Sequence, residues 1–216
     1  MTRRDEILAE MDLSPVWKLR ARQPATEEPV GQQATWIELK QAVPACTQCG
    51  LHKARTQTVF GVGDENADWL LVGEAPGAEE DRLGEPFVGQ AGRLLDNMLA
   101  AIDLKRGENV YICNVLKCRP PGNRNPEPDE VAKCTPFLLR QIELIDPKLV
   151  VAMGRFAAQT LLNTDASIAS LRGRVHRYAG RPLIVTYHPA YLLRNLPDKS
   201  KAWSDLVFAK RTMAAL

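Results

Sequence analysis

The stretch from Trp69 to Gly92 restricts the fold of this 216-residue chain more than any other. It opens with an apolar run, Trp69–Val72, that is typical of a buried strand. The next five residues, Gly73–Gly77, include two glycines and a proline, which predict a tight turn with exposed backbone N–H groups. A second glycine-rich loop, residues 86–92, leads into a helix that begins at Arg93. Ligands of open α/β sheets bind at such strand-to-helix loops, although an ordinary connection can have the same composition.

The same succession of apolar run and helix continues along the chain and predicts a parallel sheet with helices on both faces. Expected strands cover residues 69–72, 110–114, 148–154 and 182–186. Expected helices cover residues 35–43, 94–102, 128–144, 155–162 and 201–216. The first helix should stop before Pro44, and the proline-rich segment after Asn114 should be an extended loop without helix. Residues 171–178 and 182–186 are expected to pair as a hairpin around Ala179–Gly180.

The length suits one domain, and a hydrophobic content of 45% is enough to bury a full core. Residues 1–33 are polar and contain three prolines, so we expect a flexible extension there and a folded domain over residues 34–216. No apolar run approaches the ~20 residues of a membrane span. The first residues also lack the apolar core of a secretory signal. A cytoplasmic protein without a membrane partner is therefore expected.

The net charge of +2 is unevenly distributed. From Ala166 to the C-terminus there are nine Lys and Arg residues and only two Asp, whereas the rest of the chain has more acidic than basic residues. This asymmetry favours a polyanionic partner at the C-terminal end. A solvated basic surface would explain the same distribution, so charge alone does not decide between them.

Four of the five cysteines form two pairs, Cys46-x2-Cys49 and Cys118-x15-Cys134. In a cytoplasmic chain such pairs favour metal or redox chemistry over a disulfide framework. Four thiolates suit zinc or a [4Fe–4S] cluster, and the long second spacing disfavours zinc without excluding it. Scattered buried cysteines are an equal alternative on spacing alone. Cys113 lies inside an apolar run and is expected to be buried and inert.

Four motifs together resemble one protein family, the family 4 or iron–sulfur uracil-DNA glycosylases. The motifs are GEAPG at 73–77, PFVG at 86–89, Asn114 followed by KCRPP at 117–121, and HPAYLLR at 188–194. Each is weak alone, but together they are specific, and the resemblance extends from about Cys46 to the C-terminus. It implies a three-layer α/β/α fold with a four-stranded parallel sheet, of the uracil-DNA glycosylase type. The implied reaction is hydrolysis of the N-glycosidic bond of deoxyuridine in DNA, which leaves an abasic site for base excision repair.

The resemblance also implies a partner and a cofactor. The partner is uracil-containing DNA, single- or double-stranded, bound by a monomer. The cofactor is a [4Fe–4S] cluster that holds the loops beside the DNA and takes no part in the chemical step. Its implied ligands are Cys46, Cys49, Cys118 and Cys134.

An enzyme that acts on a base must take it out of the stack, so a flipped uracil needs a stacking ring and hydrogen bonds to its edge. Phe87 is the expected ring, and the carboxamide of Asn114 suits the O4 and N3–H edge of uracil. Cleavage leaves negative charge on the base, which a neutral His188 and backbone N–H groups of the first motif would stabilise. The uracil-binding residues implied are Gly73, Ala75, Gly77, Glu80, Phe87 and Asn114.

The attacking water has no evident general base. Better-known glycosylase families place an Asp where this chain has Ala75, so Glu74 is the nearest carboxylate and is expected to position or polarise the water. Backbone groups could serve instead, because the reaction is largely dissociative. The resemblance suggests that Glu80 crowds the 5-methyl group that distinguishes thymine from uracil. Glu74 could equally brace the loop, and Glu80 could equally face solvent.

Leu192 is expected to enter the duplex in place of the flipped base, supported by Leu193 and Arg194. An ordinary core position is the alternative for Leu192. Phosphate contacts, which carry no sequence information, are expected from Arg172, Arg174 and Arg177.

Three other functions compete with hydrolysis. A related branch becomes covalently attached to uracil-DNA, but it carries a basic insert with a histidine, and no histidine follows Asn114 in that segment. A non-enzymatic iron–sulfur DNA-binding module would not need Phe87, Asn114 and His188 together. A nucleotide-handling α/β enzyme would use a phosphate-binding G-x4-G-K-[ST] motif, which the sequence lacks.

Overall fold

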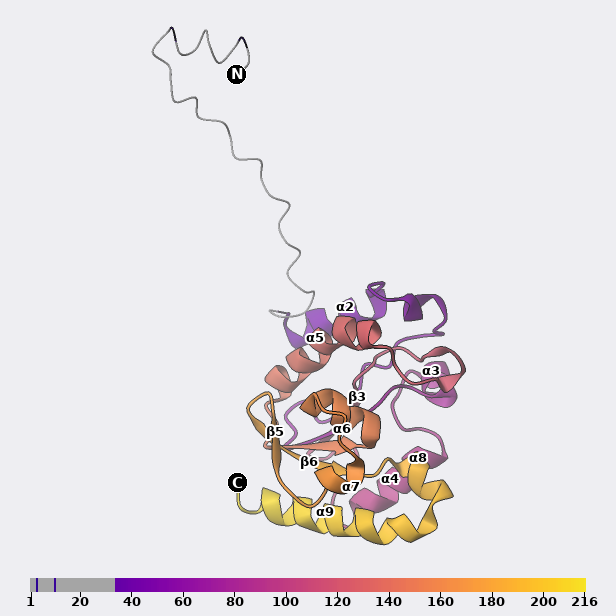
Figure 1. Cartoon of the computed structure of the whole chain (residues 1–216), viewed down its shortest axis with the longest axis vertical. Helices are drawn as coiled ribbons and strands as arrows, with labels where there is room; N and C mark the ends of the chain where they lie inside the picture. Colours follow the sequence, from indigo (N-terminus) through magenta and orange to yellow (C-terminus); the bar gives the residue numbers. More distant parts are fainter. Residues whose placement is uncertain (1–2, 4–9, 11–33) are drawn as a thin grey trace.

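The computed structural model describes residues 3, 10 and 34–216 (Figure 1). The flexible extension predicted over residues 1–33 therefore lies outside the described residues, apart from Arg3 and Glu10. Within the described range, no helix is long and apolar enough to cross a membrane.

A six-stranded sheet forms the centre of the molecule, with the strand order β1-β3-β2-β4-β6-β5. The four inner strands are parallel, as predicted. They are β2 (Trp69–Gly73), β3 (Val110–Asn114), β4 (Leu149–Met153) and β6 (Arg181–Thr186). Every residue of β2, β3 and β4 is buried, because helices cover both faces of the sheet. This burial explains why these strands are continuous apolar runs in the sequence.

Two antiparallel edge strands extend the predicted four-stranded sheet to six. β1 (Val62–Gly63) pairs with β3, and β5 (His176–Tyr178) pairs with β6. The β5–β6 hairpin agrees with the predicted pairing and turns at Ala179 and Gly180, which both have positive φ. Its first strand is shorter than predicted, because β5 begins at His176 and Leu171 belongs to a short helix. No apolar run marks β1, because it has only two residues and one of them is glycine.

Helices cover both faces of the sheet and complete the three predicted layers (Figure 1). One face is covered by α5 (Pro128–Ile145) and α6 (Arg155–Leu162). The other is covered by α4 (Gln90–Ala100) and α9 (Lys199–Met213). Outside these layers, α2 (Trp36–Ala45) packs on α5, where a separate hydrophobic cluster joins them.

Short helical segments occur where the sequence predicts loops. They are α3 (Ala78–Leu83), α7 (Ile168–Leu171), α8 (Pro189–Arg194), and the 3-10 turns η1 (Gly50–Lys53), η2 (Pro121–Asn123) and η3 (Leu196–Asp198). The turn η2 corrects the prediction that the segment after Asn114 contains no helix. The helix α2 also continues through Pro44, beyond its predicted end. A proline in the last, exposed turn removes one backbone donor without breaking the helix interior.

The strand order places a switch point between β2 and β4. The chain passes from β2 to β3 on one side of the sheet and then reaches β4 on the other side. Crevices of open α/β sheets form at the carboxyl ends of strands where connections diverge in this way. The loop of residues 74–77 follows β2 and Gly154 follows β4, so the fold brings these two segments to one edge.

Candidate active site

A cleft of about 710 Å³ opens at this switch point. Its walls come from the loops after β2 and β4, from the end of β3 and from the start of α8. The cleft brings together most of the predicted catalytic and uracil-binding residues: Glu74, Ala75, Gly77, Glu80, Phe87, Asn114 and His188. Gly73 lies directly behind this wall, against Asn114 and Phe87.

The ring of Phe87 is buried and stacks with the imidazole of His188, with ring centroids 5.3 Å apart and planes at 30°. Gly73 leaves room for the ring, because a Cβ atom there would lie 2.7 Å from Phe87 Cζ. Gly92 leaves room for the backbone, since its Cβ would lie 1.7 Å from the Phe87 carbonyl oxygen. Phe87 itself has a φ of 56°, which non-glycine residues rarely adopt. The two glycine-rich loops therefore fix an aromatic ring at the cleft.

Asn114 ends β3 and is 2% exposed. Its Oδ1 atom accepts no hydrogen bond from the described residues. A Cβ atom on Gly73 would lie 2.4 Å from this oxygen, so the glycine is needed for the carboxamide to fit. A buried polar atom without a partner costs roughly 1–3 kcal/mol and calls for an explanation. Because Asn114 lines the cleft, the N–H group of a ligand in the cleft is a candidate partner for this oxygen.

His188 precedes α8 and caps it, because its Nδ1 accepts a hydrogen bond from the backbone N–H of Ala190 at 3.1 Å. Burial lowers the pKa of His188 to about 4; the positive charge of Arg194 acts in the same direction and Glu80 opposes it. The imidazole is therefore neutral at pH 7. Since Nδ1 is an acceptor, Nε2 carries the proton. His188 can thus donate one hydrogen bond without bringing a charge into the cleft.

Glu74, in the first loop, and Glu80, in α3, have different surroundings. Burial raises the pKa of Glu74, and the nearby Arg155 opposes this shift. Glu80 accepts hydrogen bonds from the backbone N–H groups of Gly77 and Val88, both at 3.1 Å. Glu80 therefore links the two glycine-rich loops, which is a structural role that the sequence interpretation did not assign to it.

The profile of the Uracil DNA glycosylase superfamily matches residues 60–207, which include every residue of the cleft described above. The chain belongs to this superfamily.

Curated relatives place it more closely among the uracil DNA glycosylases. A type-4 uracil-DNA glycosylase of Archaeoglobus fulgidus is 49% identical over 164 residues, which cover 72% of this chain and 82% of the relative. A type-4 uracil-DNA glycosylase of Thermotoga maritima is 47% identical over 159 residues, which cover 73% of this chain and 82% of the relative. A third, of Sulfurisphaera tokodaii, is 43% identical over 166 residues, which cover 73% of this chain and 76% of the relative. The chain is therefore a member of the type-4 group, in agreement with the motif resemblance.

A second, smaller cavity is lined by the four paired cysteines, Cys46, Cys49, Cys118 and Cys134. The Sγ of Cys118 accepts a hydrogen bond from Arg55 Nη1 at 3.0 Å. The Sγ of Cys134 accepts one from the backbone N–H of Lys117 at 3.3 Å. Burial raises the pKa of both thiols, and the cations of Arg55 and Lys117 oppose the shift at Cys118 and Cys134 respectively.

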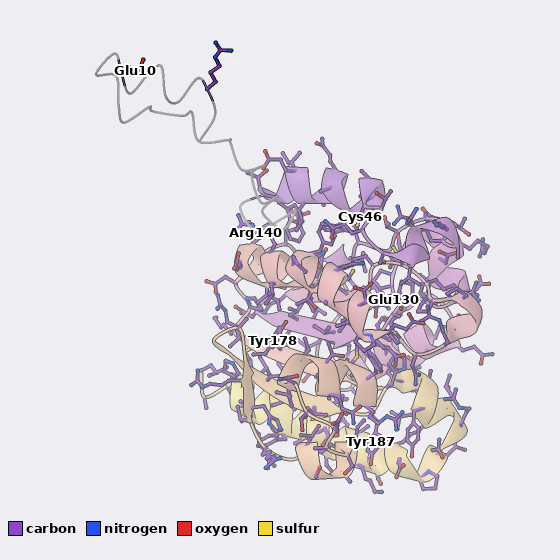
Figure 2. The ribbon with its side chains drawn as sticks, turned by 45° about the horizontal axis from the view of Figure 1, so that its top comes forward. Glu10, Cys46, Glu130, Arg140, Tyr178 and Tyr187 are labelled. Carbon is purple, nitrogen blue, oxygen red and sulfur yellow. The ribbon has the colours of Figure 1, made fainter. Side chains whose placement is uncertain are left out.

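The cysteine cavity lies at the C-terminal end of α2, where Figure 2 labels Cys46. Over the described part of the chain, no group of three or more His, Cys, Asp or Glu side chains is arranged to hold a metal ion. All five cysteines are free thiols, and Cys113 is buried in β3 as expected. The structure thus gathers the four predicted ligands around one cavity without showing a metal centre.

The helix α8 exposes a different leucine from the one predicted. Leu192 is 1% exposed and packs with Tyr187 and Ala202, whereas Leu193 is 38% exposed. Successive residues of a helix point about 100° apart, so one of two adjacent leucines can pack in the core while the other faces solvent. Leu192 is therefore a core residue in this structure, as its alternative interpretation expects, and its role as the wedge stays a prediction.

Arg172 is engaged inside the protein. Its Nε donates to Asp205 Oδ2 at 2.6 Å, and its guanidinium lies 4.9 Å from the centroid of the Tyr187 ring, a residue labelled in Figure 2. These contacts leave Arg172 poorly placed for the predicted phosphate contact. Three other predicted DNA contacts are exposed: Arg174, Arg177 and Arg194.

The sequence interpretation assigned no role to several residues of the cleft. The rings of Tyr187 and Tyr191 stack with centroids 5.2 Å apart and planes at 11°, and both residues line the cleft. Their spacing of four residues across the start of a helix is a signal that could have indicated the pair. Arg155 also lines the cleft, directly after the glycine that ends a predicted strand.

Proposed function

We propose that this protein is a uracil-DNA glycosylase, which flips deoxyuridine out of DNA and hydrolyses its N-glycosidic bond. The observation that carries the proposal is the buried Oδ1 of Asn114, which has no donor among the described residues and lies in the same cleft as the stacked Phe87 and His188. The names of the type-4 relatives support the same activity. The product is an abasic site, the starting point of base excision repair.

Recognition of uracil is assigned to Phe87 and Asn114. The flipped base stacks on Phe87, the Oδ1 of Asn114 accepts the uracil N3–H, and its Nδ2 donates to O4. Cytosine has an acceptor at N3 and a donor at position 4, so it meets this carboxamide with the wrong polarity. Gly73 supports the discrimination because it lets the carboxamide and the ring approach each other closely.

Catalysis is assigned to His188 and Glu74. As the C1′–N1 bond breaks, its electron pair stays on the base, and the Nε2–H of the neutral His188 donates to the uracil oxygen where negative charge develops. Water then adds to C1′ of the sugar. Glu74 is the cleft carboxylate proposed to orient this water, and its raised pKa suits a group that accepts a proton late in the reaction.

Cys46, Cys49, Cys118 and Cys134 are proposed to hold a [4Fe–4S] cluster. Their common cavity supports this assignment, as do the donors at Cys118 and Cys134, because N–H groups stabilise thiolate sulfur. When bound, the cluster supplies a cross-link between α2, the segment after β3, and α5. No step of the glycosidic cleavage is assigned to it.

DNA binding is assigned to the exposed side chains near the cleft. Leu193, in place of the buried Leu192, is proposed to fill the space of the flipped base. Arg194 and Arg174 are proposed to contact phosphates. We also propose that the protein acts as a monomer on uracil in single- or double-stranded DNA.

The test is an incubation of the purified protein with an end-labelled oligonucleotide that carries one deoxyuridine, followed by alkaline cleavage of abasic sites. The matched control carries thymidine at the same position. Strand cleavage at uracil and not at thymine is expected. Uracil-specific binding without cleavage would replace the proposal with a binding module. A protein–DNA adduct that survives denaturation would replace it with covalent attachment.

A further inference from the structure

Lys117 is one of the largest fully buried side chains of the described protein, with 1% exposure. It lies three residues after Asn114 and directly before Cys118, between the cleft and the cysteine cavity. Burying an ammonium group is costly unless its hydrogen bonds are made. The position of Lys117 therefore requires an explanation in terms of its partners.

The partners of the ammonium group are two neutral oxygens. Its Nζ donates to the backbone carbonyl of Asn114 at 2.9 Å and to Gln141 Oε1 at 2.6 Å. Gln141, on α5, is itself fully buried, and its Nε2 donates to the Phe60 carbonyl at 3.0 Å. Among the described residues, no ion pair joins Lys117 to a carboxylate, so its contacts serve to hold particular oxygens in place.

The Asn114 carbonyl is a group that the sheet alone leaves without support. On that side of β3 the neighbouring strand is β1, which pairs only with Tyr111 and Ile112. Beyond these residues the edge of β3 has no strand partner in the described structure. The Nζ of Lys117 donates to the Asn114 carbonyl in place of a strand N–H group. On the opposite side, Gly73 leaves just enough room for the carboxamide. Asn114 is thus held from both sides at the point where its Oδ1 meets the cleft.

Lys117 also belongs to the segment that contacts the cysteine cavity. Its backbone N–H donates to Cys134 Sγ at 3.3 Å, and its backbone carbonyl accepts from the N–H of Val59 at 2.8 Å. One residue therefore connects α5, the cysteine cavity and the residue at the end of β3. No other described side chain bonds to the Asn114 carbonyl.

We propose that Lys117 is a positioning residue for base recognition, which fixes the Asn114 carboxamide in the orientation that reads uracil. This inference rests on the proposed function, because it takes Asn114 to be the uracil-reading group. Lys117 touches neither the base nor the sugar. It acts through Asn114, and it ties the reading group to α5 and the cysteine cavity.

The experiment compares Lys117→Met, which keeps the length of the side chain and removes its donors, with the wild type. Free uracil competes for the base pocket alone, so its inhibition constant reports the pocket. We expect this constant to rise by about tenfold or more in Lys117→Met, as for loss of a hydrogen bond from a charged group. The dissociation constant for DNA with an abasic site should change by less than about twofold, because phosphate contacts do not involve Lys117. An unchanged inhibition constant would overturn the inference.

A matched variant and a double-mutant cycle separate positioning from general destabilisation. Ile142→Val alters a buried residue next to Gln141 on α5 and should leave uracil inhibition unchanged. In single-turnover cleavage, Lys117→Met should slow the wild type by about tenfold or more but slow an Asn114→Ala background by less than about twofold. Equal effects in both backgrounds would mean that Lys117 does not act through Asn114.

A second variant applies if Lys117→Met does not fold. Gln141→Met removes the other anchor of the ammonium group, and it should weaken uracil inhibition in the same direction at an iron content equal to that of the wild type. An unchanged inhibition constant in this folded variant would overturn the inference. A wild type that neither cleaves uracil-DNA nor binds free uracil would instead overturn the proposed function, which is a different result.

Discussion

His188 acts as a neutral donor because of its immediate surroundings. The N–H of Ala190 occupies Nδ1, and burial keeps the ring uncharged. We predict that His188→Ala lowers the single-turnover cleavage rate by about 10²–10³-fold, as for the loss of one donor to a developing anion. The affinity for uracil-DNA should stay within a few fold. Cleavage at a near-normal rate would remove His188 from the mechanism.

The lowered pKa of His188 also predicts a pH effect on stability. The unfolded chain binds a proton at this residue as pH falls below 6.5, whereas the folded chain does so only near pH 4. The unfolded state therefore binds more protons between these values, and the free energy of unfolding should fall as pH decreases from about 6.5 to about 4. His188→Gln should show a shallower decrease over this window in urea titrations. Parallel curves for the two proteins would contradict the assigned pKa shift.

Single residues also show where sequence interpretation reaches its limit. Phe87, Asn114 and His188 could be predicted because each stands at a strand end or in a glycine-rich loop. The choice between Leu192 and Leu193 could not, since both are apolar and only the helix rotation decides which is buried. The engagement of Arg172 depends on Asp205, which lies 33 residues away in the sequence.

The helix α3 and the loop before α4 form one unit through Glu80. Its carboxylate bonds to the N–H groups of Gly77 and Val88, so we predict that Glu80→Ala loosens both glycine-rich loops. Amide exchange at Val88 should accelerate, and the cleavage rate should fall by about tenfold or more, because Phe87 lies in the released loop. Glu79→Ala is the matched control, since the Glu79 side chain makes only an exposed ion pair, with Arg82, among the described residues. Equal exchange rates in the two variants would reject the bracing role.

The two leucines of α8 should respond oppositely to truncation. Leu192→Ala should lower the free energy of unfolding by about 2–5 kcal/mol, as for other buried leucines. Leu193→Ala should leave stability nearly unchanged and reduce cleavage of uracil in double-stranded DNA more than in single-stranded DNA, because only a duplex closes over the extruded base. Equal losses on both substrates would contradict the assignment of the wedge to Leu193.

Secondary-structure elements were predictable to the extent that burial leaves a pattern. The four inner strands are apolar runs because both faces of the sheet are covered. The helices α4, α5, α6 and α9 follow from periodicity, with small errors at their ends. Short elements lack such a pattern: α3 has six residues and depends on Glu80, which bonds across to another loop. The strand β1 exists only because β3 offers it an edge.

The architecture of the whole molecule places two cavities on the two sides of one connection. The main cleft lies where β2 and β4 diverge, and the cysteine cavity lies where α2 packs on α5. The segment from Asn114 to Cys118 passes from one to the other. A cross-link at the cysteine cavity would therefore hold the end of β3 at a fixed place relative to the cleft.

This arrangement predicts that the four cavity cysteines act as a set and that the fifth does not. Cys49→Ala should lose bound iron and the associated visible absorption, and its unfolding midpoint should fall by several degrees, because binding to the folded state alone stabilises that state. Cys113→Ala is the matched control: this thiol is buried in β3 outside the cavity, so its removal should leave the iron content unchanged. Elemental analysis measures the iron content of both variants, and calorimetry measures their unfolding midpoints. A Cys49→Ala protein with full iron content would reject the ligand set. A Cys49→Ala protein without iron but with wild-type stability and cleavage rate would show that the cysteine cavity does not support the active site. The segment from Asn114 to Cys118 would then hold its position without any cross-link.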